Sequence, residues 1–453
     1  MQISPARRVA FQILRRVEDE AAHSSILLAH ADNDLNQKDR ALSHELVLGS
    51  LRRQLWLDRT IEHFASRKVD SLDLAVVIAL RLGLYQLRFL SRIPASAAIN
   101  ESVNLVKAAR VKSASGFVNA VLRRATREPN YDPAADVDDE IEKTSIQSSH
   151  PRWLIARWTS QFGFEQAKAI ADANNEPAAI SFRLTAKALH GDLKWSEEII
   201  GELNASGAGL AESMIAPGAW RLTGREDAGA PTRMLALLRF ANDGLTYFQD
   251  EGSQLVAHLL GAGDGERVLD VCAAPGSKST LVGALAPQSA IIACDLYEHR
   301  VQTMKQLATQ QGGRNIQFAV HDATNDLPFA PQSFDRVLVD APCSGTGTLR
   351  HNPEIRWRLK PADLTELADK QATILKYAGQ VLARGGLLLY STCSLETEEN
   401  EEVAAQFLNR CSDFEPAPLP GPASLTATSG AVRTWPHQDM ADGFFAMGFR
   451  RKG

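Results

Sequence analysis

Cysteine is scarce in this chain of 453 residues, and the few thiols do not follow the pattern of a disulfide framework. Five cysteines are present: Cys272, Cys294, Cys343, Cys393 and Cys411. Their number is odd and no Cys-x-x-Cys spacing occurs, which argues against a disulfide-stabilised scaffold and against a zinc site. We therefore expect free, reduced thiols and no bound metal.

Long apolar runs are also missing. The longest uncharged apolar run near the N-terminus, residues 74–80, is far shorter than the roughly 20 residues that a membrane-spanning helix needs. Arginines interrupt any apolar core of a secretory signal, at Arg7, Arg8, Arg15 and Arg16. With 44% apolar and 23% charged residues, the composition is that of a globular protein. These features predict a cytoplasmic protein with no membrane partner, and we expect it to be a monomer.

The chain has no overall surplus of positive charge, since its net charge is −5, but its charge is unevenly distributed. Residues 1–128 contain 20 Lys and Arg against 13 Asp and Glu, whereas the remainder contains 29 against 41. This asymmetry is typical of a polyanion-binding module attached to an acidic enzyme body. A helical domain rich in surface arginine would give the same counts, so charge alone leaves both interpretations open.

Hydrophobic periodicity predicts two N-terminal domains joined by a linker. Residues 1–130 show apolar positions at helical spacing, which predicts an all-α bundle. Residues 131–149 are acidic and contain few apolar side chains, as in a linker. Residues 150–243 combine a helix pattern after His150 with a strand pattern at 180–184, and they predict a small α/β connecting domain.

Residues 244–453 repeat the order strand, loop and helix. The strand candidates, which alternate with helical stretches, are residues 268–271, 291–294, 316–320, 337–339 and 387–390. This rhythm predicts an α/β doubly wound, Rossmann-like parallel sheet. Residues 443–449 alternate apolar and small side chains and are expected to pair antiparallel at the end of the sheet.

The loop after the first of these strands has features of a nucleotide-type cofactor site. Gly276 allows the backbone to approach a ligand closely, and a helix starting near Ser277 presents free N–H groups to an anionic group. Lys278 adds a positive charge there. Asp295 ends the second strand, where an acid accepts hydrogen bonds from ribose hydroxyls, and Asp322 ends the third and can accept from an adenine amine.

Two other kinds of cofactor loop are missing. A P-loop needs glycine at position 271 and an adjacent Gly-Lys pair, but the chain has Val271 and Gly276-Ser277-Lys278. A dinucleotide fingerprint needs its glycines after the strand, whereas Gly261, Gly263 and Gly265 precede it. A nicotinamide-dependent oxidoreductase is therefore disfavoured. The remaining alternative is that these glycines and acids only form turns.

Two thiols follow strand candidates and indicate covalent chemistry. Asp340-Ala341-Pro342-Cys343 and Ser391-Thr392-Cys393 each begin where an apolar run ends, and the two strands are expected to be neighbours. A thiolate that adds to C6 of a cytosine makes C5 nucleophilic, and the second thiol can remove the C5 proton or release the adduct. Asp340 can hydrogen-bond or protonate N3 of the ring. Spacing does not say which sulfur attacks.

Burial as a small apolar residue is the alternative for any free thiol. We expect it for Cys272, Cys294 and Cys411 rather than for the two cysteines at strand ends.

These motifs resemble those of the NOL1/NOP2/Sun family of RNA cytosine-C5 methyltransferases. The resemblance covers residues 244–450 and rests on residues 248–254, 272–278, 340–345 and 391–394, and the whole length resembles the bacterial Sun (Fmu) branch. One departure is that Ser277 and Ser279 stand where the family usually has Gly and Thr. Because serine is small and keeps a hydroxyl, we expect weaker consequences than from loss of Gly276.

The resemblance implies methylation of C5 of a specific cytosine in 16S ribosomal RNA, naked or in a small-subunit assembly intermediate. It implies Cys393 as nucleophile, Cys343 as the residue that assists release, and Asp340 as a third catalytic residue. It also implies that S-adenosyl-L-methionine is bound by Cys272, Ala273, Ala274, Pro275, Gly276, Ser277, Lys278, Asp295, Asp322 and Asp340. The N-terminal helical portion is similar to the NusB RNA-binding domain.

Two sets of residues are candidates for contact with RNA. Phosphate contacts are expected from Arg52, Arg53, Arg123 and Arg124, for each of which a solvated helix face is an equal possibility. Guanidinium groups interleave with an aromatic ring at Arg350, Arg356, Trp357 and Arg358, which suits backbone contacts and stacking of unpaired bases. A ribosome-assembly protein with an inert methyltransferase domain is the alternative, and the intact loop and both thiols argue against it.

Overall fold

The computed structural model describes residues 3–31, 35–191, 195–205, 209–223 and 230–453. The chain divides into two compact units, Met1–Pro177 with Leu349–Leu359 and Ala178–Thr348 with Lys360–Gly453. Each unit has its own buried apolar core. Among the described helices, none combines the length and the apolar character that a membrane crossing requires.

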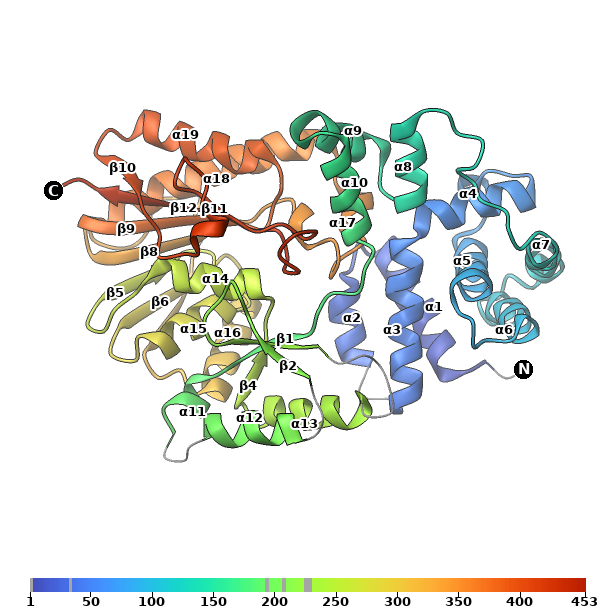
Figure 1. Cartoon of the computed structure of the whole chain (residues 1–453), viewed down its shortest axis with the longest axis horizontal. Helices are drawn as coiled ribbons and strands as arrows, with labels where there is room; N and C mark the ends of the chain where they lie inside the picture. The colour runs from blue at the N-terminus through green and yellow to red at the C-terminus, as the bar shows by residue number, and fades with distance from the viewer. Residues whose placement is uncertain (1–2, 32–34, 192–194, 206–208, 224–229) are drawn as a thin grey trace. The chain divides into compact units, whose positions relative to one another are not determined.

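The first unit is helical, as the periodicity predicts, and Figure 1 shows its helices from blue to teal. Helix α5 is buried almost all round because its side chains are apolar on every face. A Cβ at Gly83 of α5 would lie 2.7 Å from Leu122 and 2.8 Å from Ser102, so glycine permits the close approach of α6 and α7. The helices are α1 (Pro5–Asp19), α2 (Ser24–Ala31), α3 (Gln37–Arg52), α4 (Gln54–Ala65), α5 (Leu74–Phe89), α6 (Ala95–Ala108), α7 (Ser115–Arg127), α8 (Glu140–Ser148), α9 (Arg152–Phe162) and α10 (Phe164–Ala173).

Helix α8 lies inside the acidic segment that the composition predicts as a linker. It begins after Asp139, whose side chain accepts the Glu142 backbone N–H at 2.7 Å and caps the helix. An acidic side chain at this position stabilises the positive end of a helix, so the acids that suggest a linker also start α8.

Residues 349–359 fold with the first unit although they lie between two segments of the second. Glu354 is buried and accepts hydrogen bonds from the Ser24 backbone N–H at 2.9 Å and the Ser24 hydroxyl at 2.8 Å. Arg358, at the end of the short helix α17 (Ile355–Arg358), donates to the carbonyl oxygens of Val17 and Ala22. These bonds fix the segment to helix α1, to α2 and to the turn between them.

The second unit begins with a small antiparallel sheet in the order β2-β3-β1-β4. Phe182, Leu184, Leu237 and Phe240 form its core against helices from the same segment. The strand predicted at 180–184 is β1. The elements are β1 (Ser181–Leu184), α11 (Ala186–Leu189), α12 (Trp195–Ala205), β2 (Leu210–Glu212), β3 (Ala219–Leu222), α13 (Ala230–Asn242) and β4 (Thr246–Phe248).

A larger sheet follows in the order β10-β12-β9-β8-β5-β6-β7, with β11 paired to β12. Strands β5 to β9 run parallel, as predicted, and β5 lies beside β8. The predicted C-terminal strand β12 pairs antiparallel with β9, and β10 adds one more strand outside it. The strands are β5 (Arg267–Asp270), β6 (Ala290–Asp295), β7 (Ile316–Val320), β8 (Phe334–Asp340), β9 (Leu382–Thr392), β10 (Phe414–Ala417), β11 (Val432–Arg433) and β12 (Phe445–Arg451).

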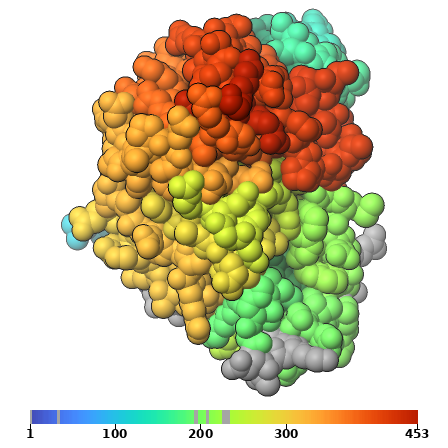
Figure 2. Space-filling model, turned by 90° about the vertical axis from the view of Figure 1, so that its left-hand side faces the viewer, coloured from blue at the N-terminus to red at the C-terminus, as the bar shows by residue number. Residues whose placement is uncertain are grey.

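Helices cover both faces of this sheet. Leu338 of β8 belongs to the core under α14 (Glu251–Leu260), α15 (Ser277–Leu285) and α16 (Glu298–Gln311), whereas Val337 and Val339 face the core under α18 (Pro361–Val381) and α19 (Glu401–Arg410). This alternation places one side chain in two on each face. The yellow, orange and red segments of this unit pack into one continuous body on the face shown in Figure 2.

The strand order places the ends of β5, β8 and β9 together. The chain runs outward through β6 and β7 and then returns to β8 on the other side of β5. In such sheets, ligands bind beyond the carboxyl ends of the strands where the order reverses. Asp270, Asp340 and Thr392 are the last residues of these three strands.

Candidate active site

The loop after β5 is shaped by Gly276. This residue has φ +101°, a conformation that favours glycine, and a Cβ there would lie 3.3 Å from the Met304 side chain. The loop is closed by hydrogen bonds from Gly276 N–H to the Ala273 oxygen at 2.7 Å and from Ala273 N–H to the Cys294 oxygen at 2.8 Å. The turn therefore holds the start of α15 at the end of the sheet, where its first N–H groups can meet an anionic group.

Asp270, the last residue of β5, is hydrogen-bonded to the first turn of the same helix. Its buried carboxyl accepts the Ser279 hydroxyl at 2.6 Å. Burial raises the pKa of Asp270 to about 7, with a further contribution from Asp340, although the Ser279 hydrogen bond opposes the rise. A carboxyl group that titrates near neutral pH thus lies directly under the loop.

Lys278 does not extend into the loop as a free charge but forms an ion pair with Asp340, with 2.7 Å between Nζ and Oδ2. Its ammonium group also lies 5.2 Å from the centre of the Phe444 ring. Burial alone would lower the pKa of Lys278, but Asp340, with smaller contributions from Cys393 and Asp270, outweighs burial and raises it. Lys278 is therefore a fixed positive charge in the site.

The two strand-end thiols lie together, as the sequence predicts. The sulfurs of Cys343 and Cys393 are 3.3 Å apart, and both side chains are half-buried. The pKa of Cys343 is raised well above its usual value, first by the hydrogen bond with Cys393, then by burial and by the charges of Cys393 and Glu399. Cys343 therefore keeps its proton and can donate a hydrogen bond to the Cys393 sulfur.

Of the two acids predicted to end strands and bind the cofactor, Asp295 is the last residue of β6, whereas Asp322 lies two residues beyond the end of β7. Asp295 accepts the Tyr297 N–H at 3.2 Å. Asp322 accepts the Thr324 hydroxyl at 2.7 Å and the Thr324 N–H at 3.0 Å, and these bonds lower its pKa. Asp322 is thus an accessible carboxylate.

Apolar side chains are exposed beside these acids. Leu296 is 41% exposed, Tyr297 48% and Val320 52%, and Val320 pairs with Asp295 in the register of β6 and β7. Large apolar side chains left open between two carboxylates are suited to cover an aromatic ring whose edge and sugar are polar. No motif in the sequence indicates these three residues, although their positions next to Asp295 and Asp322 are a signal that could have identified them.

Together these residues fit S-adenosyl-L-methionine. The glycine turn and the first N–H groups of α15 suit its amino-acid portion, Asp295 suits ribose hydroxyls, and Asp322 with the exposed apolar side chains suits the adenine. Of the three thiols expected to be buried, Cys294 is buried, whereas Cys272 and Cys411 are half-buried, and burial raises the pKa of all three.

Arg183 connects the small sheet to this loop and is a fourth site residue that the sequence patterns do not indicate. Its guanidinium group is buried and donates to the Ser277 oxygen at 3.1 Å, Thr280 Oγ1 at 2.9 Å, Gln249 Oε1 at 2.8 Å and Gln311 Oε1 at 3.0 Å. Burial lowers the pKa of Arg183 to about 10. A side chain from β1 therefore holds the first turn of α15 by hydrogen bonds.

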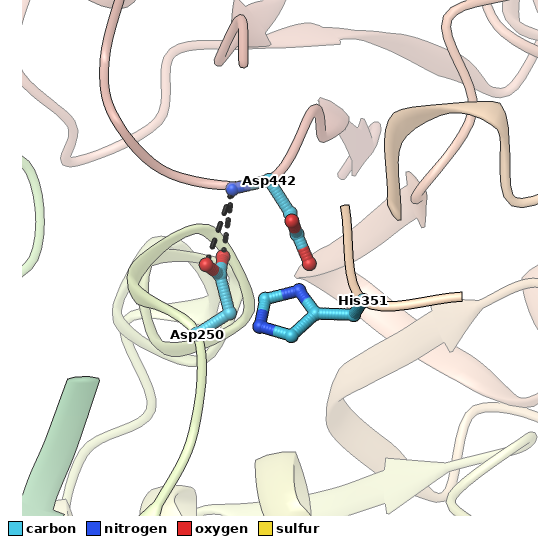
Figure 3. Close-up of side chains that lie close together, drawn as sticks. All are labelled: Asp250, His351 and Asp442. Atoms are coloured by element: carbon cyan, nitrogen blue, oxygen red, sulfur yellow. Dashed lines mark hydrogen bonds between the residues drawn. The ribbon is translucent and has the colours of Figure 1, made fainter. Parts of the chain in front are cut away.

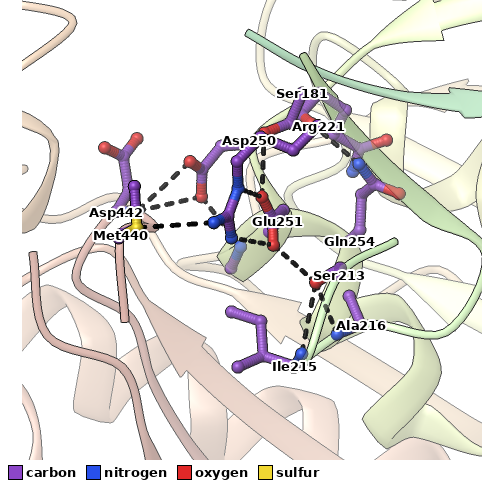
Figure 4. Close-up of polar contacts among 12 residues, drawn as sticks. Ser181, Ser213, Ile215, Ala216, Arg221, Asp250, Glu251, Gln254, Met440 and Asp442 are labelled. Carbon is purple, nitrogen blue, oxygen red and sulfur yellow. Dashed lines mark hydrogen bonds and ion pairs between the residues drawn. The ribbon is translucent and has the colours of Figure 1, made fainter. Parts of the chain in front are cut away.

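The segment 248–254 has a structural role at the start of α14. Asp250 accepts the Gly252 N–H at 2.8 Å and the Asp442 N–H at 3.1 Å (Figure 3). Glu251 is fully buried and accepts hydrogen bonds from Arg221 at 2.6 and 2.8 Å and from Ser213 at 2.5 Å (Figure 4). These bonds join the small sheet, helix α14 and the loop before β12 around the site.

The RNA-binding candidates lie in different surroundings. Arg123 and Arg124 are exposed on α7, and Arg53 is half-buried with a hydrogen bond to the Gln147 oxygen. Arg52 and Arg350 are buried, and Arg52 donates to the Arg350 oxygen at 2.8 Å.

Arg356 and Arg358, also RNA-binding candidates, are engaged by groups of the first unit. Arg356 is fully buried, donates to the Ser149 oxygen at 3.1 Å and to Asn175 Oδ1 at 3.0 Å, and has its pKa lowered to about 9 by burial and by nearby arginines. Arg358 and Trp357 are half-buried. RNA contacts by these residues remain predictions, and they would require the bound guanidinium groups to exchange protein carbonyls for phosphates.

Three family models match successive parts of the chain. Residues 4–127 match the NusB family, residues 150–227 match the Methyltr_RsmF/B-like, ferredoxin-like domain, and residues 257–450 match the 16S rRNA methyltransferase RsmB/F. The architecture is accordingly an all-helical NusB-like domain, a small ferredoxin-like domain and a Rossmann-like methyltransferase domain.

Curated relatives match along the whole length. A probable ribosomal RNA small subunit methyltransferase B from Bacillus subtilis (strain 168) is 33% identical over 465 residues and covers 100% of both chains. The ribosomal RNA small subunit methyltransferase B of Yersinia enterocolitica is 31% identical over 442 residues, with 97% of each chain covered.

Solved structures share the fold. The crystal structure of PH0851 is 25% identical, covers 100% of both chains and has a TM-score of 0.83. The crystal structure of NSun6 from Pyrococcus horikoshii with SFG is 21% identical, covers 67% of this chain and 98% of that one, and has a TM-score of 0.58.

Proposed function

The chain belongs to the 16S rRNA methyltransferase RsmB/F family, and we propose that it methylates C5 of a cytosine in 16S rRNA through a covalent bond between Cys393 and C6. The observation that carries this proposal is the pair of sulfurs 3.3 Å apart at the carboxyl ends of two neighbouring parallel strands. A single thiol would suffice for binding or packing, whereas attack on a ring and later release of the adduct use two groups.

The first step needs a nucleophilic sulfur. Cys343 keeps its proton and donates a hydrogen bond to the Cys393 sulfur, and Lys278 adds a fixed positive charge nearby. Both groups can stabilise negative charge on the Cys393 sulfur during its attack. The thiolate forms a bond to C6 of the cytosine, and the electron pair of the C5–C6 double bond moves into the ring toward N3.

The second requirement is to stabilise the charge that appears on the ring. Asp340 lies in a hydrogen-bonded chain between Lys278 Nζ at 2.7 Å and Ser391 Oγ at 2.9 Å. A proton shared along this chain can be presented to N3 as its negative charge builds. The chain thereby favours the adduct in which C5 is nucleophilic.

The cofactor that this site fits is S-adenosyl-L-methionine, which when bound supplies a methyl group to a nucleophilic carbon. We propose that residues 272–278, Asp295, Asp322 and Asp340 hold it, with Leu296, Tyr297 and Val320 around its adenine. After C5 has gained the methyl group, a base must remove the C5 proton so that the C6–S bond breaks and the ring becomes aromatic again. Once the Cys393 sulfur is bonded to C6, the interaction that contributes most to raising the pKa of Cys343 is lost, so Cys343 can release its proton to solvent. As a thiolate it takes the C5 proton, and the electrons of the C6–S bond return to the Cys393 sulfur.

The RNA must present an unpaired base, because C5 and C6 of a stacked cytosine are shielded by its neighbours. We propose that 16S rRNA or a small-subunit assembly intermediate is held in part by the NusB-like domain, whose exposed Arg123 and Arg124 suit phosphate contacts.

The test is the behaviour of the two cysteine variants with small-subunit rRNA and radiolabelled cofactor. Cys393→Ala should abolish methylation, whereas Cys343→Ala should leave protein covalently trapped on RNA, visible as a slow band in a denaturing gel. Cys411→Ala is the matched control, because Cys411 lies just beyond the end of α19 rather than at either strand end, and should behave as wild type. Full turnover by Cys393→Ala would refute the mechanism, and bisulfite sequencing of rRNA with and without the protein locates the modified base.

A further inference from the structure

The separation of the two sulfurs is not set by the sheet. The last contacts of the ladder are Asp340 opposite Ser391 and the hydrogen bond from Ala341 N–H to the Ser391 oxygen at 2.9 Å. Both cysteines come after these contacts, in loops that leave the sheet. Another part of the molecule must therefore hold the two loops in register.

Glu399 touches both loops at the residue that follows each thiol. Its Oε2 accepts the hydroxyls of Ser344 and Ser394, each at 2.5 Å, and its Oε1 accepts the Ser344 backbone N–H at 2.8 Å. Ser344 directly follows Cys343, and Ser394 directly follows Cys393. One carboxyl group thus joins the two loops at matching positions.

The surroundings of Glu399 stabilise its contacts with the two loops. The side chain is fully buried, and none of the described basic residues forms an ion pair with it. A buried carboxylate without a cation is costly unless several donors satisfy it. Gln371 Nε2 supplies a fourth donor at 2.9 Å, and the Tyr390 hydroxyl donates to the Glu399 main-chain oxygen at 2.5 Å.

Further bonds hold the Cys393 loop on either side of the thiol. Asn400 Nδ2 donates to the Ser394 oxygen at 2.9 Å, and Asn400 Oδ1 accepts the Thr392 hydroxyl at 2.5 Å. Gly347 N–H donates to the Cys393 oxygen at 2.9 Å, and a Cβ at Gly347 would overlap the Gly443 oxygen. Asn400 and Gly347 thus hold the Cys393 loop on both sides of the thiol, and Glu399 is the side chain that contacts the residue after each cysteine.

We propose that Glu399 is a positioning residue that sets the distance between the Cys343 and Cys393 sulfurs through Ser344 and Ser394. The geometric part of this proposal concerns the protein alone. We call the contacts of Glu399 with Ser344 and Ser394 the clamp. The consequence rests on the proposed function: if Cys343 takes the C5 proton and Cys393 leaves, loss of a clamp contact changes the distance between the sulfurs and slows release of the adduct more than its formation.

The test uses the full-length protein without RNA. Dibromobimane becomes fluorescent when both of its ends alkylate thiols that lie close together, and peptide mass spectrometry identifies the 343–393 link among the five cysteines. Glu399→Gln keeps the size of the side chain but replaces the acceptor Oε2 by an N–H donor. We expect it to slow formation of the 343–393 link about tenfold, the factor that corresponds to loss of one charge-assisted hydrogen bond.

The matched control is Glu402→Gln, an exposed glutamate in helix α19, which should form the link at the wild-type rate. Link formation by folded Glu399→Gln at the wild-type rate would overturn the proposal. If Glu399→Gln does not fold, Ser344→Ala and Ser394→Ala decide, because each removes one donor and leaves the carboxylate three others. Slower linking in both supports the clamp, and wild-type linking in both refutes it.

A second readout tests the consequence. With rRNA and cofactor, Glu399→Gln should accumulate trapped adduct relative to product, with the KM for the cofactor unchanged, which a general loss of folding would not produce. A wild-type ratio of adduct to product in a variant whose linking is slow would refute the effect on release. If no adduct forms even with Cys343→Ala, the proposed function fails, while the linking rates still decide on the clamp.

Discussion

Lys278 Nζ lies 2.7 Å from Oδ2 of Asp340, and this ion pair joins the cofactor loop to the segment that leads to Cys343. Ser391 donates to the other oxygen of the same carboxyl at 2.9 Å, and two residues later the chain reaches Cys393. Asp340 therefore connects all three segments of the site. A change in this carboxyl or its partner acts on the cofactor loop and on both thiols together.

We expect Lys278→Met to lower the rate of methyl transfer by about 100-fold, the size of effect seen when one preorganised electrostatic partner is removed. The variant leaves Asp340 without its cation and removes the positive charge near the attacking sulfur. Single-turnover transfer of labelled methyl groups to rRNA measures the rate. Lys305→Met, which removes an exposed lysine on α16, is the control. A rate for Lys278→Met within twofold of wild type would contradict the role of the pair.

The pH dependence of stability should carry the signature of Asp270. Its pKa is raised to about 7 by burial, so in the folded state it resists ionisation between its ordinary value of 3.8 and about 7. Below pH 3.8 the carboxyl is protonated in both the folded and the unfolded chain, and its contribution to stability is fully present. As the pH rises from 3.8 to about 7, only the unfolded chain ionises, so this contribution is lost. Asp270→Asn removes this titration, so the melting temperature of the variant minus that of wild type should increase from pH 5 to pH 8.

Asp326→Asn is the control for this experiment because Asp326 is exposed. Its melting-temperature difference from wild type should stay constant over the same range. A constant difference for Asp270→Asn as well would mean that Asp270 does not titrate there.

Arg183→Met should weaken binding of S-adenosyl-L-methionine about tenfold, because the first turn of α15 loses the donors that hold the Ser277 oxygen and Thr280. The buried amide oxygens of Gln249 and Gln311 also lose their partner, so the melting temperature should fall. Isothermal titration of the cofactor measures the affinity, with the exposed Arg314→Met as control. Unchanged affinity in the folded variant would show that the cofactor loop does not depend on Arg183.

The double change Arg123→Gln and Arg124→Gln should weaken binding of small-subunit rRNA without changing methyl transfer at saturating RNA. Each side chain that neutralises a phosphate contributes about one unit to the slope of log affinity against log salt, so the slope should fall by about two. Arg124 already contacts the Phe64 oxygen and ring, which keeps it in place on α7. Filter binding at several salt concentrations measures the slope, and Arg384→Gln in the other unit is the control. An unchanged slope would exclude α7 as a phosphate contact.

Local patterns were sufficient for the architecture. Apolar strands of the correct length separated by helical stretches determine a doubly wound sheet, because strand and helix periodicities depend on neighbouring residues. The rules of that fold then bring Cys343 and Cys393 to one edge, since both follow neighbouring parallel strands. The sequence also placed Asp295 at the end of β6, and Asp322 lies two residues beyond the end of β7 rather than at it.

The tertiary structure decided which partner each polar side chain has. By sequence alone, Lys278 could pair with a ligand or with Asp340. Glu399 lies in an acidic stretch whose composition is typical of the solvent-exposed start of a helix. Arg356 has donors that suit a phosphate, yet buried carbonyl oxygens of the first unit accept them. Except for Ser394, which is five residues from Glu399, these partners are from 9 to more than 200 residues away along the chain. Local periodicity carries no information about contacts at such separations. Packing alone brings them within hydrogen-bonding distance, and burial then sets the pKa shifts on which the chemistry depends.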